Sequence, residues 1–222
     1  MDASGLLEAI RRGDSDAVRS ALRDDPALAL ARDQSGVSAI CLAVYLGRDD
    51  IARELARTRD DLDVFEASTL GEVGRVRELV ASSPELANAC SPDGFHPLGY
   101  ACFFGREPLV ELLLDANADL EAPARNAMQV RPLHSAVAHS DPTIALSLAA
   151  RLLEAGASPN VTQQNGFTPL HEAALRGHAE LVRLLLRNHA DPSARNSEGC
   201  TPADLARQHG HAEVLEVLEL AV

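Results

Sequence analysis

Tryptophan and lysine are missing from this chain of 222 residues, and aromatic side chains make up only 3% of it. Apolar residues still account for 46%, so the chain can bury the core of one domain, and that core must consist of Ala, Leu and Val. Such small aliphatic side chains suit short helices that pack closely. With all basic residues being Arg and with Ala abundant, the composition is typical of codon bias in a GC-rich genome, and we expect a bacterial source.

The charge balance and the lack of long apolar runs argue against several classes of partner. A net charge of -13 and an isoelectric point near 5.0 disfavour nucleic acid, whose phosphates need a basic surface, and anionic lipid. The same charge favours attraction of a basic partner protein. No stretch approaches the roughly 20 apolar residues of a membrane span. We therefore expect a soluble protein that binds neither nucleic acid nor membranes.

Signals for export are also absent. The N-terminal sequence MDASGLLEAIRRGDSD has no apolar run preceded by positive charge, so no signal peptide is expected. The cysteines, Cys41, Cys90, Cys102 and Cys200, show no CxxC spacing, which predicts free thiols in a reducing cytosol. A cytoplasmic location is the resulting prediction.

Motifs that carry enzyme chemistry are missing as well. The phosphate-binding patterns GxGxxG and GxxxxGK[ST] and the nucleophile elbow GxSxG do not occur. His171-Glu172 begins like a zinc-protease motif, but Leu175 stands where the second His is required. His209-Gly210-His211 has no Cys or acidic ligand at a set spacing, and Cys102 occupies a tight slot that suits buried packing. We predict no catalytic, cofactor-binding or metal-binding residue.

The most regular part of the chain is the stretch 165–191, which reads NGFTPLHEAALRGHAELVRLLLRNHAD. Asn165-Gly166 is a turn signal, Thr168 is placed to cap a helix, and Pro169 takes the first helical position, which needs no backbone N–H. Gly177 breaks this helix, and apolar residues at helical spacing then predict a second one. Neither short helix can bury its apolar face alone, so both need copies on either side.

These residues resemble an ankyrin repeat. The matching positions are Thr168-Pro169-Leu170-His171, the Ala173-Ala174 pair, Gly177-His178 and the run from Val182 to Leu186. The resemblance implies an all-α fold, an ankyrin-repeat solenoid of stacked helix-turn-helix units with short β-hairpin-like loops, and a protein that binds other proteins. It also implies that His134 and His171 bond the backbone of a neighbouring repeat, and that His178 and His211 are surface capping residues.

Glycine at the turn between the paired helices recurs along the chain. It occurs at Gly13, Gly47, Gly71, Gly105, Gly177 and Gly210, with Ser140 in the same slot of one unit. A period of roughly 33 residues is that of ankyrin repeats, and it divides a single domain, 1–222, into about seven units. Their approximate bounds are 4–32, 33–60, 61–90, 91–121, 122–160, 161–195 and 196–222, the first and last being polar end caps.

The third unit lacks a hairpin loop. Only 24 residues separate its glycine, Gly71, from Gly47. The unit therefore has to start at once, with Asp61 or Asp63 as the cap of its first helix.

Two further departures concern the fifth unit and two prolines. The fifth unit has a longer leading loop, 122–126, and its second helix, which starts at Asp141, gains about one turn. Pro26 and Pro84 each follow a second helix, and each is expected to end that helix and to start an extended segment.

In ankyrin repeats, partners are contacted mostly through the hairpin tips and the two positions before the inter-helix glycine, which line the concave face. Most of the seven aromatic residues of this chain fall in these slots. The predicted partner-binding residues are Val37, Tyr45, Leu46, Phe95, Phe103, Phe104, Val130, His139, Phe167 and Arg176. We favour a binding patch around Phe103-Phe104, because exposed apolar patches mark interaction sites and aromatics dominate hot spots. The alternative is that Phe95 and Phe167 pack against neighbouring hairpins and that one of the paired phenylalanines turns into the stack.

Full coverage by repeats without a catalytic constellation favours a non-enzymatic protein–protein interaction module, a monomer that binds a partner protein on its concave face. The alternative is a protein that binds a small molecule or metal, or hydrolyses a substrate, through a pocket in the irregular third to fifth units. Self-association through the end caps or the concave face is a third hypothesis.

Overall fold

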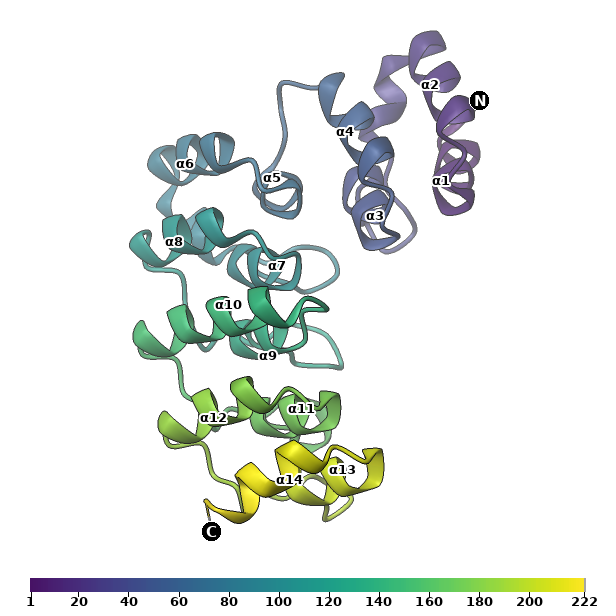
Figure 1. The fold of residues 1–222 in the computed structure, drawn as a ribbon. Coiled ribbons are helices and arrows are strands. Elements are labelled where there is room, and N and C mark those ends of the chain that lie inside the picture. The colour runs from purple at the N-terminus through teal and green to yellow at the C-terminus, as the bar shows by residue number, and fades with distance from the viewer. Residues whose placement is uncertain (222) are drawn as a thin grey trace. The chain divides into compact units, whose positions relative to one another are not determined.

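The computed structural model describes residues 1–221 and shows a helical chain (Figure 1). Within these residues no strand forms, and an isolated bridge pairs Arg32 with Ser38. The predicted all-α fold class is therefore confirmed. Contacts gather the chain into two compact blocks, an N-terminal block, Met1–Pro97, and a C-terminal block, Leu98–Val222, and the single continuous domain stays a prediction. Val222, the last residue of the expected seventh unit, lies outside the described residues.

The N-terminal block consists of three helix pairs. They are α1 (Ala3–Arg12) with α2 (Ser15–Asp24), α3 (Ala39–Tyr45) with α4 (Asp49–Arg57), and α5 (Val64–Leu70) with α6 (Val73–Ser82). Gly13 and Gly71 end the first helix of a pair with φ of 73° and 83°, in the left-handed region that costs Gly least. The cap of α5 is Asp63, one of the two predicted residues, whose carboxylate accepts from the Phe65 and Glu66 N–H groups at 2.9 Å each.

The prediction of an extended segment after Pro26 and after Pro84 is wrong. Both prolines instead start short 3-10 helices, η1 (Pro26–Leu30) and η2 (Pro84–Asn88). Each proline does end the preceding α-helix, because the residue before it adopts an extended φ of -147° or -146°. The fixed proline φ then suits the first position of a 3-10 turn, so the chain coils once more before the next helix pair.

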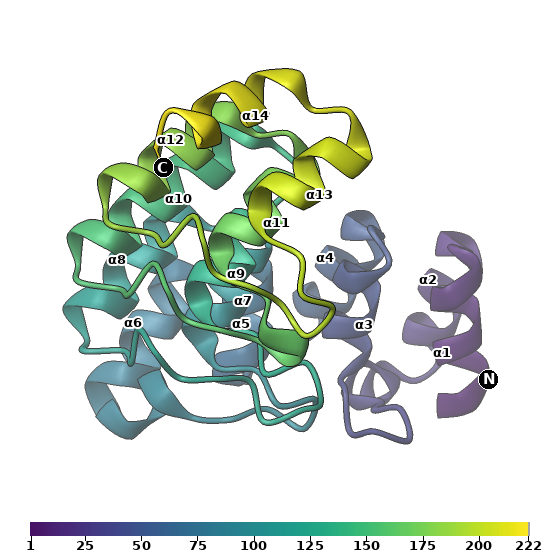
Figure 2. The same cartoon turned by 90° about the horizontal axis from the view of Figure 1, so that it is seen from below.

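The C-terminal block repeats the pairing in two rows of helices. Helix α7 (Pro97–Phe103) begins at the last residue of the N-terminal block. The others are α8 (Glu107–Asp115), α9 (Pro132–Val137), α10 (Pro142–Glu154), α11 (Pro169–Arg176), α12 (Ala179–Arg187), α13 (Pro202–His209) and α14 (Ala212–Glu219), with a 3-10 turn η3 (Gln164–Gly166). Helices α9, α11 and α13 pack in one row, and α8, α10, α12 and α14 in a second row (Figure 2).

The local signals in 165–191 act as predicted. Thr168 caps α11, because its hydroxyl accepts from the His171 N–H at 3.3 Å, and Gly177 ends the helix with φ 73°. The one-turn extension in the fifth unit is also confirmed, since α10 has 13 residues whereas α8 and α12 have 9 each.

Alanine recurs at the centre of every helix pair. The residue four positions before the glycine slot is Ala in each unit, and each of these alanines is 0% exposed: Ala9, Ala43, Ala67, Ala101, Ala136, Ala173 and Ala206. A methyl group here lets neighbouring helices approach closely, and a larger side chain would overfill the space. The low aromatic content is thus explained by a core of tightly spaced short helices.

Candidate partner-binding surface

Two of the predicted residues lie exposed at the end of α3. Tyr45 is the last residue of this helix and is 37% exposed, and Leu46 follows as its cap and is 41% exposed. The Tyr45 hydroxyl donates a hydrogen bond to Asp93 Oδ2 at 2.7 Å. The phenol is therefore held at its polar end while part of its surface remains in solvent. Nothing in the sequence signalled this pairing across 48 residues.

The missing hairpin of the third unit brings the loops before α3 and α7 together. A Cβ on Gly36 would lie 3.0 Å from Pro92 Cβ, so the two loops touch where a third loop is absent. Val37 and Phe95 belong to these loops, and each is half-buried. This placement supports the alternative for Phe95, packing beside a hairpin loop. The signal in the sequence was the 24-residue interval between the glycines.

Phe103 and Phe104 form an aromatic pair at the end of α7. Phe103 is 44% exposed, whereas Phe104 is half-buried. Their ring centroids are 5.0 Å apart with an interplanar angle of 88°, an edge-to-face contact, and Phe104 also stacks at 6.3 Å on Tyr100. The structure thus divides the pair: Phe104 leans on the helix stack, and Phe103 presents its ring to solvent.

His139 completes this cluster from the next repeat. A Cβ on Gly105, the residue after Phe104, would lie 2.6 Å from His139 Nε2, so the imidazole rests on the glycine. Gly105 has φ 67°, and only the absence of a side chain leaves room for the ring. His139 Nδ1 accepts from the Asp141 N–H at 3.1 Å. The half-buried imidazole is therefore fixed beside the aromatic pair.

The other three predicted residues are held by their own surroundings. Phe167 is half-buried, with its ring 5.3 Å from the His171 ring. The Val130 carbonyl accepts from the Ala124 N–H at 2.8 Å within the leading loop of the fifth unit. Arg176 is exposed and donates to Glu172 Oε1 at 2.6 Å along α11. None of these three adds an unengaged group to the cluster around Phe103.

The motif histidines have the structural role that the repeat implies. His134 Nε2 lies 3.1 Å from the Phe167 carbonyl and His171 Nε2 lies 3.1 Å from the Cys200 carbonyl. A carbonyl can only accept, so Nε2 donates in both rings. Burial lowers the pKa of both, that of His134 to about 4, which keeps each ring neutral.

The histidines differ at their second nitrogen. His171 Nδ1 accepts from the Thr168 hydroxyl at 2.8 Å and from the Thr168 N–H at 3.2 Å, whereas Arg131, which has no hydroxyl, takes the place of Thr168 in the fifth unit. His134 Nδ1 accordingly has no hydrogen-bond partner within residues 1–221. His211 also contacts the backbone of the neighbouring repeat, since its Nε2 lies 3.0 Å from the Leu175 carbonyl.

The remaining candidates for chemistry are packed into the core or dispersed. Cys102 is 0% exposed, as predicted for core packing, and burial raises the pKa of its thiol. Across residues 1–221, no group of three or more His, Cys, Asp or Glu could hold a metal ion. Three cavities of about 240, 380 and 550 Å³ lie in the N-terminal block, and no histidine lines any of them. No helix in the described part of the chain is long and apolar enough to cross a membrane.

Two family models match the chain. A model of ankyrin repeats (many copies) matches residues 152–206, and a model of the ankyrin repeat matches residues 93–122. This chain is an ankyrin-repeat protein. Ankyrin repeats are generally protein–protein interaction modules, so the cluster around Phe103 and the exposed end of α3 are candidate contact surfaces of such a module.

Curated relatives match about half of this chain, over a smaller part of their own length. The ankyrin-repeat chain is 31% identical over 133 residues to a probable E3 ubiquitin-protein ligase, XBOS31, of Oryza sativa subsp. japonica. It is 32% identical over 119 residues to ankyrin repeat, SAM and basic leucine zipper domain-containing protein 1 of Nomascus leucogenys, and 36% identical over 116 residues to tyrosine-protein kinase HTK16 of Hydra vulgaris. These matches cover 59%, 53% and 50% of this chain but only 28%, 24% and 14% of the relatives. The chain therefore spans less than a third of each of these relatives, and the activities in their names are stated of those proteins.

Proposed function

We propose that this ankyrin-repeat protein is a non-enzymatic interaction module that binds a partner protein through the residues before its inter-helix glycines. The observation that carries the proposal is where large apolar side chains are exposed. Seven such side chains are exposed within residues 1–221, and Tyr45, Leu46 and Phe103 are three of them. The slots before the glycine are only two positions in a repeat of roughly 33 residues, so these side chains are concentrated there.

Each block contributes one patch. The Tyr45–Leu46 patch lies at the end of α3 in the N-terminal block. The Phe103–Phe104 patch lies at the end of α7 in the C-terminal block, with His139 packed beside it. Aromatic side chains whose neighbours already fix their rotamers lose little entropy on binding, which favours them as hot-spot residues.

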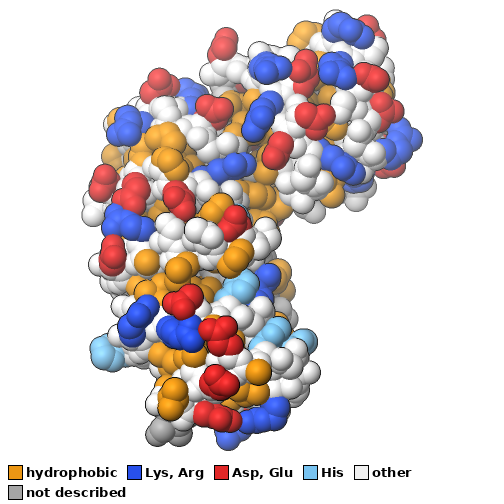
Figure 3. Space-filling view, viewed as in Figure 1, with side chains coloured by type: hydrophobic (Ala, Val, Ile, Leu, Met, Phe, Trp, Pro, Cys, Tyr) orange, Lys and Arg blue, Asp and Glu red, His pale blue; other side chains and the backbone are white. Residues whose placement is uncertain are grey.

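The partner expected from these features is apolar at the contact and basic overall. Figure 3 shows acidic and basic side chains interspersed over the visible face, without a broad field of one sign. Since no broad charged field marks a contact site on this face, we assign the net charge of -13 a long-range role, the attraction of a basic protein. The apolar patches then supply the affinity at the contact. We also infer that the chain acts in the cytoplasm and as a monomer. Sedimentation velocity at two concentrations tests the monomeric state.

Capture of the partner from a lysate of the source organism, followed by single substitutions, tests the proposal. Phe103→Ala should weaken binding of the captured protein by about 2 kcal/mol, or roughly thirtyfold in Kd. Its melting temperature should stay close to that of the wild type, because Phe103 is 44% exposed. Tyr45→Ala tests the other patch in the same way.

The matched controls are Leu30→Ala and Leu220→Ala, which remove exposed apolar side chains outside both the slots and the hairpin loops. They should leave Kd within about twofold of wild type. A partner that binds the Phe103→Ala and Tyr45→Ala variants as tightly as the wild type would refute the assignment. Equal losses in the controls would do the same, because they would indicate general hydrophobic adsorption.

A further inference from the structure

The second helices of the N-terminal block are not evenly packed. Helix α2 packs against α4, but among the described residues α4 and α6 have no comparable contact, and the third helix pair is attached chiefly through α5 against α3. In the C-terminal block, α8, α10, α12 and α14 pack in an unbroken row. The cause is the missing hairpin, because residues 58–63 pass directly from α4 to α5 and leave the second helices apart.

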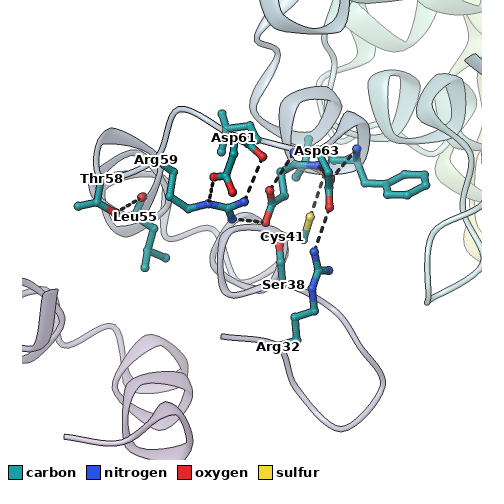
Figure 4. A network of polar contacts seen from close by, with 12 residues as sticks. Arg32, Ser38, Cys41, Leu55, Thr58, Arg59, Asp61 and Asp63 are labelled. Atoms are coloured by element: carbon teal, nitrogen blue, oxygen red, sulfur yellow. Dashed lines mark hydrogen bonds and ion pairs between the residues drawn. The ribbon is translucent and has the colours of Figure 1, made fainter. Parts of the chain in front are cut away.

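A buried polar network fixes this connection (Figure 4). Arg59 donates from Nε to Asp61 Oδ1 at 2.8 Å and from a terminal guanidinium nitrogen to Glu66 Oε1 at 2.7 Å. The Arg59 and Glu66 side chains are only 7% and 1% exposed. Glu66 also accepts from the Asp63 N–H at 3.1 Å. The connection between α4 and α5 is therefore held in one conformation, because separating two buried opposite charges is costly. It forms a fixed wall on this side of the block.

A groove of about 380 Å³ lies against this wall. It is lined by Arg53, Ala56, Arg57, Leu62, Leu70 and Glu72. Leu62 is buried and Ala56 and Leu70 are half-buried, so the floor is apolar, whereas both arginines and Glu72 are exposed at the rim. The volume is near the lower end for ligand pockets, about 300–1,000 Å³.

The arginines of the rim decide what the groove can accept. Arg53 and Arg57 are four residues apart on α4, so their side chains lie about one helical turn apart on one face. Arg57 is matched by Glu54 at 3.4 Å, in an exposed pair of little strength. Arg53 has no ion pair or hydrogen bond within residues 1–221. Glu72 is the one carboxylate of the lining, so the two arginines leave the rim with an excess of positive charge. The occupant that fits the groove best therefore brings negative charge to the rim beside Arg53 and Arg57 and an apolar side chain to the floor.

We propose that this groove binds an acidic amphipathic helix of a partner protein. A Leu-type side chain of that helix covers Leu62 and Leu70, and carboxylates one turn apart pair with Arg53 and Arg57. Helix-in-groove binding of this kind reads out side chains at three- and four-residue spacing. The groove shares with the proposed pre-glycine surface only the slot residue Leu70, so the two surfaces can be tested independently.

Selection of peptides on the full chain tests the proposal. A random peptide library displayed on phage is selected against the wild type, and the enriched peptides are synthesised with a fluorescein label and titrated by fluorescence anisotropy. We expect enrichment of Leu with Asp or Glu at three- or four-residue spacing, and a Kd that rises with salt. Arg53→Glu with Arg57→Glu should weaken binding at least about tenfold, since both rim charges are reversed.

The control is Arg23→Glu with Arg77→Glu, which makes the same charge change at exposed arginines of α2 and α6 outside the groove. It should leave Kd within about twofold of wild type, and circular dichroism verifies that both double variants are folded. Failure to recover peptides, peptides without acidic enrichment, or binding that survives the reversal of Arg53 and Arg57 overturns the groove. Peptides that lose affinity with Phe103→Ala instead overturn the groove while supporting the pre-glycine surface.

Discussion

Removal of Glu66 is the sharpest test of how the irregular third unit is held. Its carboxylate is 1% exposed, pairs with Arg59 at 2.7 Å and accepts from the Asp63 N–H at 3.1 Å. Glu66→Ala leaves the Arg59 guanidinium buried with Asp61 as its remaining partner, and Asp61 is 70% exposed. Breaking a buried ion pair costs about 3–5 kcal/mol. Because Asp61 compensates part of the charge, we expect a loss of about 3 kcal/mol in the free energy of unfolding.

Urea unfolding followed by far-UV circular dichroism measures this loss. Hydrogen exchange of the α5 amides accompanies it, because a repeat protein can open at one interface before the rest unfolds. The matched control is Glu78→Ala, which removes the carboxylate of the Arg75–Glu78 pair, whose side chains are 32% and 72% exposed. That exposed pair is worth less than about 1 kcal/mol.

A double variant separates the charge from the space it fills. Arg59→Met with Glu66→Leu replaces both charges by apolar side chains, and such exchanges are often close to neutral. We therefore expect it to be more stable than Glu66→Ala alone. If Glu66→Ala costs no more than Glu78→Ala, the pair is not buried in solution and the wall of the proposed groove is not fixed as described.

Two further predictions concern the turns and the buried histidines. Gly177→Ala should cost about 1–2 kcal/mol, because Gly177 has φ 73° and a Cβ would meet His211 Nδ1 at 2.5 Å. Gly74→Ala inside α6, with nothing within 4 Å, should stabilise by about 0.5–1 kcal/mol, and equal changes in melting temperature would contradict this contrast. Burial lowers the pKa of His134 from 6.5 to about 4, so the unfolded chain binds more protons between these values and stability falls as pH falls through that window. His134→Gln should flatten this slope in pH-dependent urea titrations, and a slope equal to that of the wild type would contradict the assignment.

The repeat pattern could be predicted from the sequence because its signals are local. The cap at Thr168, the left-handed turn at Gly177 and the extra turn of α10 each depend on residues within a few positions. The 24-residue interval between Gly47 and Gly71 likewise predicted the missing hairpin, because so short a stretch of backbone leaves no room for the loop. Where the local argument failed, at Pro26 and Pro84, two backbone conformations were both compatible with the proline ring, and the 3-10 turn formed.

For the candidate surfaces, the sequence predicted which residues occupy the contact positions but not how their side chains are oriented. The sequence placed Phe103 and Phe104 in the same slot, but it could not say which ring leans on Tyr100 and which faces solvent. That choice depends on rotamers and on the packing of neighbouring helices. The predicted His139 proved to be seated on Gly105, a contact that requires the adjacent repeat to be in place.

The sequence by itself determined the helix pairs and their buried alanines. Both depend on local turn residues and on a spacing that recurs from one repeat to the next. Tertiary structure alone decided the contacts between repeats: the Tyr45 hydroxyl on Asp93, the Arg59–Glu66 pair and the groove beside it. These contacts join groups that are distant along the chain or lie on different secondary-structure elements. Their existence depends on how closely the helices stack, and in this protein the stacking changes where a single hairpin is missing.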